Sequence, residues 1–158
     1  MDKAAIYKEV ADQIAAVNAG EPSRTARMAT ASCLLSQAFD YFFWTGFYVV
    51  DSHKDRELVV GPYQGTLGCL RIPFARGVCG ACATQQATII VDDVHAFPGH
   101  IACDSQTNSE IVVPVFTDDG ALFAVLDVDS TALNSFDEVD KLGLEVICKS
   151  LLTGATQN

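Results

Sequence analysis

The sequence predicts a mixed α/β (α+β) fold in which a mainly antiparallel sheet carries N-terminal and C-terminal helices packed on one face. Apolar residues recur at helical spacing before residue 40 and again after residue 138. Between these segments, β-branched and aromatic runs alternate with short polar turns, which is typical of β-hairpins. Hairpins joined in sequence give an antiparallel sheet, and helices at both chain ends are expected to pack together on one side of it.

Two helices are predicted ahead of the first strand. Residues 3–18 form the first, because apolar side chains fall at helical spacing before Gly20: Tyr7, Val10, Ile14 and Val17. Pro22 is expected in the first turn of the second helix, which is predicted to end near Ala38. The side chains that this second helix is predicted to bury are Met28, Leu34, Leu35 and Phe39.

The middle of the chain is predicted to form two hairpins with a short strand, a short helix and another strand between them. The first hairpin starts at Phe42 with FFWTGFYVV and returns through ELVVGPY after the turn DSHKD. A short strand is expected through Cys69 and Ile72, followed by a helix that begins at Gly77 and by the strand TIIV. The second hairpin joins EIVVPVF to ALFAVLDVD through the turn DDG.

A long loop separates the strand TIIV from the second hairpin. Residues 92–109 form an 18-residue segment without a clear period, which is too long for a simple connection in a compact domain. Loops of this length are usually functional or disordered. Cys103 lies in this loop between histidines and acids, so the loop is the first place to look for chemistry.

A third long helix is predicted to close the chain. Ser135 and Glu138 have the spacing of a capping box ahead of an apolar pattern. The apolar side chains of this pattern are Val139, Leu142, Val146, Ile147 and Leu151. Helical segments therefore stand at both ends of the predicted sheet.

Length and charge restrict the class of protein. A chain of 158 residues fits one domain, 1–158, and folding removes about 70% of the extended surface of such a chain from water. The net charge of -10 argues against nucleic-acid backbones and anionic membranes, so a small molecule or a protein is the expected partner. The apolar runs are too short to cross a bilayer and no secretory signal is visible, so a cytoplasmic location is expected.

Six cysteines are distributed unevenly along the chain. Cys33 and Cys148 lie in helical apolar patterns and are expected to fill space in the core. The other four fall within 35 residues: Cys69, Cys79, Cys82 and Cys103. Without a signal peptide, reactive or metal-binding thiols are favoured over a disulfide framework.

Three carboxyl groups are predicted to converge near these thiols. Asp127 and Asp129 lie two apart on a strand, so their side chains point to the same face, and Glu110 starts the neighbouring strand of the hairpin. Mutual repulsion is expected to raise the pKa of at least one acid, which makes it a proton donor near neutral pH. The carboxylates that stay ionised are suited to bind an ammonium group.

Thiols and acids together indicate a redox reaction at sulfur. Cys103 would be the nucleophile, and Cys69 or Cys79 could close a disulfide with it if the fold brings the loops within bonding range. Acids near Cys103 would also raise its pKa, so a positive group or a set of backbone N–H groups must offset them. His100 and Arg71 are candidates, and the alternative is an ammonium group brought by the bound substrate.

Two other interpretations of these residues stay open. Four zinc ligands of acceptable type exist in the C-x-x-C and H-x-x-C spacings of Cys79, Cys82, His100 and Cys103, although Cys82 is expected on a helix face. An acid at a strand end is often only a turn residue, and His95 and His100 are expected mainly to fix the loop by hydrogen bonds. Trp44 and Tyr48 either belong to the core or form the wall of a pocket.

Several motifs resemble those of the free methionine-(R)-sulfoxide reductases, which are enzymes built on a GAF domain. They occur in the order GPYQG, CLRI, ARGVCG, DVHAFPGHIACDS, SEIVVPV and VLDVDS. The similarity runs from about Trp44 to Asp140, and GHIACDS with the downstream SEIVVP is far more specific than a lone cysteine motif. The resemblance implies a GAF-like fold with about six antiparallel strands and the reduction of free L-methionine-(R)-sulfoxide.

The resemblance also implies roles for individual residues. Cys103 matches the catalytic cysteine, Cys69 the resolving cysteine, and Cys79 an auxiliary or alternative resolving cysteine. The residues that match the substrate-binding acids and the aromatic wall are Glu110, Asp127, Asp129, Trp44 and Tyr48. Two positions depart from the family pattern. Cys82 stands where a small non-thiol residue is usual, and Asp118-Asp119 adds an acid to a turn without an expected effect on the site.

The implied reaction passes through a sulfenic acid on Cys103 and an intramolecular disulfide, which a dithiol such as thioredoxin reduces. It requires no metal and no organic cofactor. Two rival functions are a non-catalytic GAF sensor that binds a small ligand and a thiol redox switch without a dedicated substrate. A homodimer through the helical face of the sheet is a further expected assembly.

Overall fold

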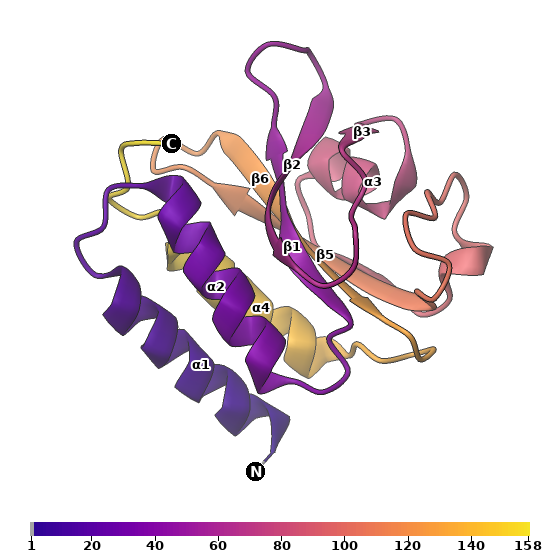
Figure 1. Cartoon of the computed structure of the whole chain (residues 1–158), viewed down its shortest axis with the longest axis horizontal. Helices are drawn as coiled ribbons and strands as arrows, with labels where there is room; N and C mark the ends of the chain where they lie inside the picture. The colour runs from indigo at the N-terminus through magenta and orange to yellow at the C-terminus, as the bar shows by residue number, and fades with distance from the viewer. Residues whose placement is uncertain (1) are drawn as a thin grey trace.

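The computed structural model of the chain describes residues 2–158 (Figure 1). Its six strands form one antiparallel sheet in the order β3-β2-β1-β6-β5-β4. The strands are β1 (Trp44–Val50), β2 (Glu57–Gln64), β3 (Arg71–Pro73), β4 (Ile89–Val91), β5 (Ser109–Phe116) and β6 (Leu122–Ser130). The helices are α1 (Lys3–Asn18), α2 (Arg24–Ala38), α3 (Gly77–Gln85) and α4 (Glu138–Leu151), with a 3-10 turn at Val94–Ala96. The predicted α+β class is confirmed.

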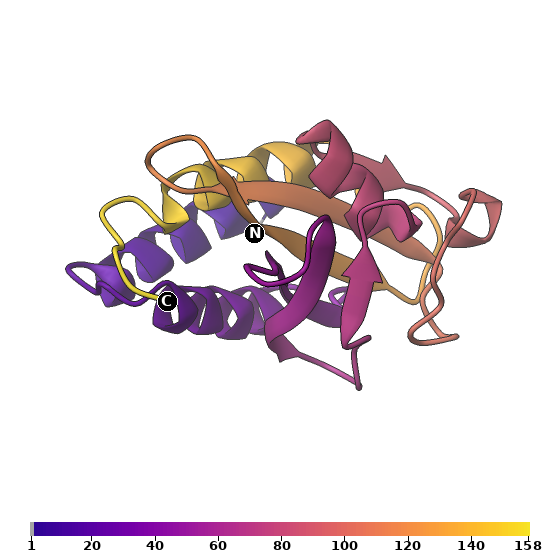
Figure 2. The ribbon, with the colours of Figure 1, turned by 90° about the horizontal axis from the view of Figure 1, so that it is seen from above.

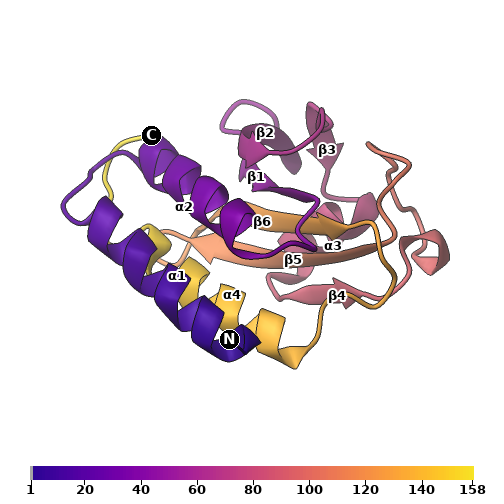
Figure 3. The ribbon, with the colours of Figure 1, turned by 60° about the horizontal axis from the view of Figure 1, so that its bottom comes forward.

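The helices are divided between the two faces of the sheet. α1, α2 and α4 lie next to one another on one side (Figure 2), where α2 packs on β1 and β2 and α4 packs on β5. The short helix α3 packs on β5 and β6 from the opposite face (Figure 3). The terminal helices therefore share one face, as predicted. Among residues 2–158, no helix has the length and apolar character needed to cross a membrane.

Successive side chains of the central strands point to opposite faces of the sheet and belong to two separate apolar clusters. Phe47 of β1 and Leu126 of β6 are fully buried in the cluster under the terminal helices. Tyr48 and Val125, one position along each strand, belong to the cluster under α3. Since side chains two apart share a face, the residues of β6 that follow Val125 on the α3 side are Asp127 and Asp129.

A buried carboxylate joins α1 to α4 on the helical face. Asp140 accepts hydrogen bonds from Tyr7 Oη at 2.7 Å, Tyr41 Oη at 2.5 Å and Lys3 Nζ at 2.7 Å. Asp140 is fully buried, so these donors replace the water that its charge would otherwise require. This network lies on the face of the sheet opposite to α3.

The N-terminal helices differ from the prediction in detail. The second helix begins after Pro22, because Ser23 is its N-cap and accepts a hydrogen bond from the backbone of Ala26. The predicted apolar positions Tyr7, Val10 and Ile14 of α1 are buried, whereas Val17 is 64% exposed at the end of the helix. Leu34 of α2 is only half-buried.

The start of α4 is a second correction. The capping box is formed by Asp137 and Asp140, not by Ser135 and Glu138. Of the predicted apolar pattern, Ile147 and Leu151 are buried. The other three residues are exposed on the outer side of the helix: Val139, Leu142 and Val146.

Two strands start later than predicted. β1 begins at Trp44 and not at Phe42, which is buried in the cluster under the terminal helices. β3 spans Arg71–Pro73 and pairs with Glu57–Val59, so Cys69 lies in the preceding loop and outside the sheet. A loop position leaves the Cys69 side chain free to meet a second loop.

Candidate active site

The three predicted acids meet on the α3 face of the sheet. Glu110 of β5 is paired directly with Asp129 of β6, and Asp127 lies two residues before Asp129 on the same face. On the other side of β6, Trp44 pairs with Asp129 and Gly46 with Asp127. The hairpin predicted from the sequence thus places the carboxyl groups next to one another and beside the aromatic end of β1.

Burial dominates the electrostatics of this carboxyl cluster. Burial raises the pKa of Glu110 and of Asp129 well above their ordinary values, and the negative charge of Asp127 raises them further. The pKa of Asp127 is raised as well, again because of burial. The cluster therefore retains protons at pH values at which ordinary carboxyl groups are ionised. Repulsion was the predicted cause, but desolvation is the larger one.

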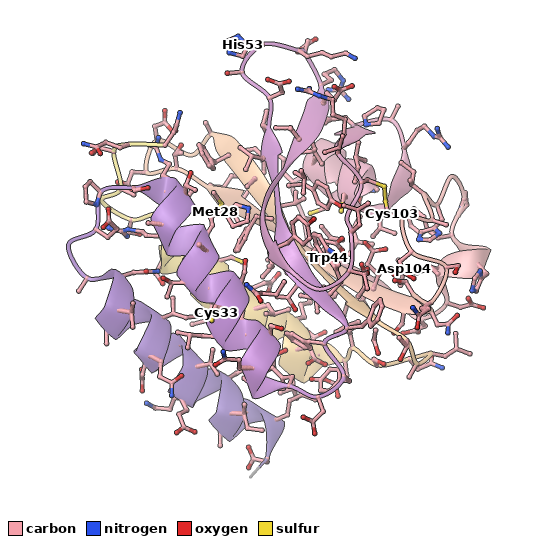
Figure 4. All side chains as sticks on the ribbon, viewed as in Figure 1. Met28, Cys33, Trp44, His53, Cys103 and Asp104 are labelled. Atoms are coloured by element: carbon pink, nitrogen blue, oxygen red, sulfur yellow. A yellow bond between two sulfur atoms is a disulfide. The ribbon has the colours of Figure 1, made fainter. Side chains whose placement is uncertain are left out.

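A disulfide joins the two loops above the acids. Cys69 is bonded to Cys103, with 5.4 Å between their Cα atoms, and is the yellow bond beside Cys103 in Figure 4. Thr66 Oγ1 donates a hydrogen bond to Asp104 Oδ2 at 2.7 Å and holds the same two loops together. Cys103 is exposed and Cys69 is half-buried, so the disulfide can be reached from solvent. The spacing of the cysteines left Cys69 and Cys79 as equal candidates for this partner.

Aromatic rings form one wall of the pocket. The rings of Trp44 and Tyr48 are stacked with their centroids 5.6 Å apart, and Tyr63 stacks on Trp44 at 4.9 Å. Trp44 Nε1 donates a hydrogen bond to the carbonyl of Thr66 at 2.8 Å, which orients the indole toward the Cys69 loop. Both Trp44 and Tyr48 are buried under the α3 face.

Gly68 lets the Cys69 loop lie directly on these rings. A Cβ atom at Gly68 would stand 2.9 Å from Trp44 Cζ2 and 3.1 Å from Tyr48 Oη. Contacts this short force a neighbour to move, and the indole is held by its hydrogen bond to Thr66. Gly68 therefore lets the loop lie against the rings directly before Cys69, which is bonded to Cys103.

These groups enclose a cavity of about 40 Å³. It is lined by every predicted site residue apart from Cys69, namely Trp44, Tyr48, Cys79, Cys103, Glu110, Asp127 and Asp129. Sequence reasoning missed other lining residues, among them Val78, Ile101 and Thr107. Their side chains are ordinary apolar or polar groups, and only the packing of α3 and of the 92–109 loop brings them here.

Cys79 enters the cavity from the first turn of α3. Its Sγ atom lies 4.0 Å from Oε2 of Glu110 and is nearly fully buried. Burial, with the charges of Asp127 and Glu110, raises the pKa of the Cys79 thiol well above its ordinary value. Cys79 is therefore a neutral thiol in this state and not part of the disulfide.

Neither of the residues suggested to offset the acids near Cys103 combines the required position with a positive charge. Arg71 pairs with Asp51 and Glu57 on the exposed edge of the sheet. His100 Nε2 lies 3.8 Å from Oε1 of Glu110, but burial lowers the pKa of His100, which favours its neutral form. Arg71 is therefore the wrong candidate, and His100 approaches the acids without a fixed charge.

His95 has the role that was expected of it. Its Nε2 atom is 3.0 Å from Oδ1 of Asn108, and Nδ2 of Asn108 donates a hydrogen bond to the carbonyl of Thr131. Asp93 accepts a hydrogen bond from the backbone of His95 at the start of the 3-10 turn. These bonds fix the two ends of the 92–109 loop against the strand pair β5–β6.

The predicted four-ligand zinc set is not assembled. Cys103 is bonded to Cys69, and burial raises the pKa of Cys82 to about 12 inside the cluster under α3. Among residues 2–158, the metal-binding side chains that come together are Cys79, Glu110 and Asp127. Cys148 is buried in the core as expected, whereas Cys33 is half-buried on α2 (Figure 4).

Known proteins share this architecture over nearly the whole chain. Residues 34–150 match the GAF domain family. A free methionine-R-sulfoxide reductase of Escherichia coli is 40% identical over 151 residues, which cover 96% of this chain and 89% of the relative. A protein of the same name from Saccharomyces cerevisiae is 37% identical over 153 residues, with 94% and 85% covered.

The similarity extends to a solved structure. The X-ray structure of free methionine-R-sulfoxide reductase from Neisseria meningitidis, in complex with its substrate, matches with a TM-score of 0.90 and 49% identity. The match covers 96% of this chain and 89% of that one. The chain therefore belongs to the GAF-domain family of free methionine-R-sulfoxide reductases.

Proposed function

We propose that the protein reduces free L-methionine-(R)-sulfoxide to L-methionine, with Cys103 as the nucleophile and Cys69 as the resolving cysteine. The observation that carries this proposal is the Cys69–Cys103 disulfide beside a cavity lined by the carboxyl groups of Glu110, Asp127 and Asp129. The relatives named above support the reaction class. A sensor or a thiol switch without a substrate would not need these acids beside the disulfide.

The cavity is chemically suited to a zwitterionic amino acid that carries a sulfoxide. Asp127 Oδ1 is buried and has no hydrogen-bond partner among residues 2–158, so a substrate ammonium group would satisfy it. A protonated Glu110 or Asp129 would donate a hydrogen bond to the sulfoxide oxygen. The stacked rings of Trp44 and Tyr48 offer an apolar surface for the substrate methyl group.

The chemical step transfers oxygen from the substrate to Cys103. The Cys103 thiolate attacks the sulfoxide sulfur while the protonated carboxyl group delivers its proton to the oxygen. The sulfur–oxygen bond of the substrate breaks and the hydroxyl group passes to Cys103 Sγ as the transient bond between the two sulfur atoms breaks. Methionine leaves, and Cys103 becomes a sulfenic acid. Cys69 then condenses with it, which forms the observed disulfide and releases water.

The structure with the Cys69–Cys103 disulfide represents the enzyme after these reaction steps, before a reductant has acted. Its cavity of about 40 Å³ holds only a few water molecules and is too small for an amino acid. Breaking the Cys69–Cys103 bond releases the Cys69 loop from the 92–109 loop, so the reduced state is the one that admits substrate. Because Cys103 is exposed, a dithiol such as thioredoxin is the proposed reductant.

The Cys103 thiolate forms only once substrate is bound. Ionised acids disfavour a nearby thiolate, and neither Arg71 nor neutral His100 offsets them. The substrate ammonium supplies the missing positive charge. Alkylation of Cys103 measured against pH should therefore shift to lower pH when a substrate analogue is present, and an unchanged profile would disprove this step.

The predicted homodimer stays a proposal that rests on α4. Val139, Leu142 and Val146 form an exposed apolar row on this helix, next to α1. Exposed apolar rows of this kind favour association between copies of a chain. Val146→Glu should shift a dimer to monomer in sedimentation experiments, and a wild-type chain that sediments as a monomer would refute the dimer.

The substrate assignment is tested by steady-state reduction with dithiothreitol as the electron donor. Free L-methionine-(R)-sulfoxide should be reduced, whereas the S epimer and a peptide-bound sulfoxide should not. Reduction of the peptide-bound form at a similar rate would contradict the proposal that the cavity recognises the substrate ammonium group. A fully reduced protein that reduces none of the three would leave the sensor and switch functions in its place.

A further inference from the structure

The residues that line one wall of the cavity also have the composition of a metal site. Cys79 Sγ, one carboxylate oxygen of Glu110 and one of Asp127 all lie within 4.8 Å of one another. The three side chains come from α3, β5 and β6, so the packing of α3 on the sheet fixes their separation. All three residues are buried.

The separation of the ligand atoms fits a tetrahedral Zn²⁺ ion. With zinc–sulfur and zinc–oxygen bonds of about 2.3 and 2.0 Å, two ligand atoms of a tetrahedral ion stand about 3.5 Å apart. Cys79 Sγ and Glu110 Oε2 are 4.0 Å apart, so small side-chain rotations bring them to that distance. A thiolate with two carboxylates favours zinc over calcium and magnesium, which prefer oxygen ligands alone.

A second observation points to a cation at this position. Asp127 is 5% exposed, and its Oδ1 atom has no hydrogen-bond partner among the residues that the structure describes. A buried carboxylate oxygen without a partner is energetically costly, and a cation that binds it removes this cost. The fourth position of the ion faces the cavity, whose 40 Å³ accommodates a bound water.

We propose that Cys79, Glu110 and Asp127 bind one Zn²⁺ ion reversibly, and that bound zinc prevents the substrate from entering the cavity. Binding replaces the proton of the Cys79 thiol, and any carboxyl proton, with the metal ion, so protons are released and no electron is transferred. Cys79 lies outside the disulfide, so the site exists whether Cys69 and Cys103 are oxidised or reduced. The exclusion of substrate rests on the function proposed above, whereas the binding of zinc does not.

Metal binding is measured first, on protein oxidised to the Cys69–Cys103 disulfide, in which these two thiols cannot act as ligands. Titration with Co²⁺ should give one bound ion per chain and a thiolate-to-cobalt charge-transfer band, which one equivalent of Zn²⁺ removes. Cys79→Ser should abolish the band, and Asp127→Asn should weaken binding at least tenfold. Cys33→Ser and Cys82→Ser, each of which removes another free thiol, should bind like the wild type.

Two results would overturn the site. One is a wild-type protein without the charge-transfer band. The other is a band that survives Cys79→Ser while the Cys33→Ser or Cys82→Ser variant loses it. Circular dichroism of each variant distinguishes a lost ligand from a lost fold, and Asp127→Asn provides an independent ligand variant if Cys79→Ser does not fold.

Exclusion of substrate is measured as a single turnover of reduced protein after removal of the reductant, because dithiols chelate zinc. Micromolar Zn²⁺ should slow the formation of methionine, higher sulfoxide concentrations should restore the rate, and EDTA should reverse the effect. Inhibition that persists in Cys79→Ser would place the metal on Cys69 and Cys103 and contradict the proposal. Zinc binding in a protein that reduces no sulfoxide would refute the proposed function but not the site.

Discussion

Glu110 on β5 lies directly opposite Asp129 on β6 on the α3 face of the sheet, where Glu110 is buried and Asp129 is half-buried. Directly opposed side chains on antiparallel strands have their Cβ atoms about 5 Å apart, so two ionised carboxylates cannot be accommodated here without a cation. One of the pair therefore keeps its proton. This relationship connects the fold to the proposed chemistry, because the retained proton is the one that the sulfoxide oxygen would receive.

The stability of the protein should fall as the pH rises through the raised pKa of Glu110. Between the ordinary pKa of 4.5 and the raised value, folded Glu110 holds a proton that the unfolded chain has already released. The free energy of unfolding falls across this window, by about 1.4 kcal/mol for each unit of the shift. The free energy of unfolding, measured with urea at pH 5 and at pH 8, should decline less between these two values in Glu110→Gln than in the wild type.

Glu9→Gln is the matched control for that comparison, because Glu9 is exposed on α1 and distant from the carboxyl cluster. Its pH dependence should equal that of the wild type. If Glu110→Gln and Glu9→Gln both follow the wild-type decline, the buried carboxyl pair does not hold an additional proton.

Removal of the resolving cysteine should separate oxygen transfer from recycling. Reduced Cys69→Ser should form about one methionine per chain in a single turnover, because Cys103 still attacks the sulfoxide. It should then stop at the sulfenic acid, which dimedone labels at Cys103. The steady-state rate with thioredoxin should fall at least tenfold unless Cys79 replaces Cys69 as the resolving cysteine. The double variant Cys69→Ser, Cys79→Ser measures the contribution of Cys79. An unchanged thioredoxin-dependent rate in the double variant would be inconsistent with a disulfide intermediate.

A methyl group added at Gly68 should slow disulfide formation. The new Cβ would stand 2.9 Å from Trp44 Cζ2, so the loop that carries Cys69 must move off the indole and is displaced from its position in the disulfide. Displacements of about 1 Å lower the rate of a proximity-dependent step by about ten- to a hundredfold. Stopped-flow measurement of sulfenic acid loss should show this delay in Gly68→Ala but not in Leu70→Ala, whose side chain is 73% exposed on the same loop. Equal rates in the two variants would show that the close approach at Gly68 is unimportant.

The Asp140 network should affect stability but not the proposed reaction. In Asp140→Ala the hydroxyl groups of Tyr7 and Tyr41 lose a buried acceptor, as does the Lys3 ammonium group. We expect a loss of about 2–4 kcal/mol in the free energy of unfolding. The rate of methionine formation by the folded fraction should stay within twofold of wild type, because the network lies on the opposite face of the sheet. A rate loss larger than the unfolded fraction explains would connect this face to the site.

The sequence patterns predicted the sheet well because strand alternation is a local property. The motif LDVDS places Asp127 and Asp129 on one face by period alone, and the DDG turn aligns β5 with β6, which brings Glu110 beside Asp129. The exposed side of α4 was not predictable in this way. Val146 and Ile147 are equally apolar in sequence, and only the position of α1 and the sheet determines which of them is buried.

The contacts between loops could not be predicted from the sequence, for a different reason. Cys69 and Cys103 are 34 residues apart, and cysteine spacing gave no preference for Cys69 over Cys79. The pairing depends on the close approach of Gly68 to Trp44 and on the hydrogen bond from Thr66 to Asp104, which are tertiary contacts. His100 likewise reaches Glu110 only because the 92–109 loop folds back over the strand ends.

Attack of Cys103 on the sulfoxide is tested by the formation of methionine from free L-methionine-(R)-sulfoxide by reduced wild type, Cys103→Ser and Cys33→Ser. Cys33 is a free, half-buried thiol on α2 and controls for non-specific thiol chemistry. We expect that Cys103→Ser loses at least a thousandfold in rate while Cys33→Ser retains the wild-type rate. Methionine formation by Cys103→Ser at a rate within tenfold of the wild type would contradict it and assign the nucleophile to another thiol.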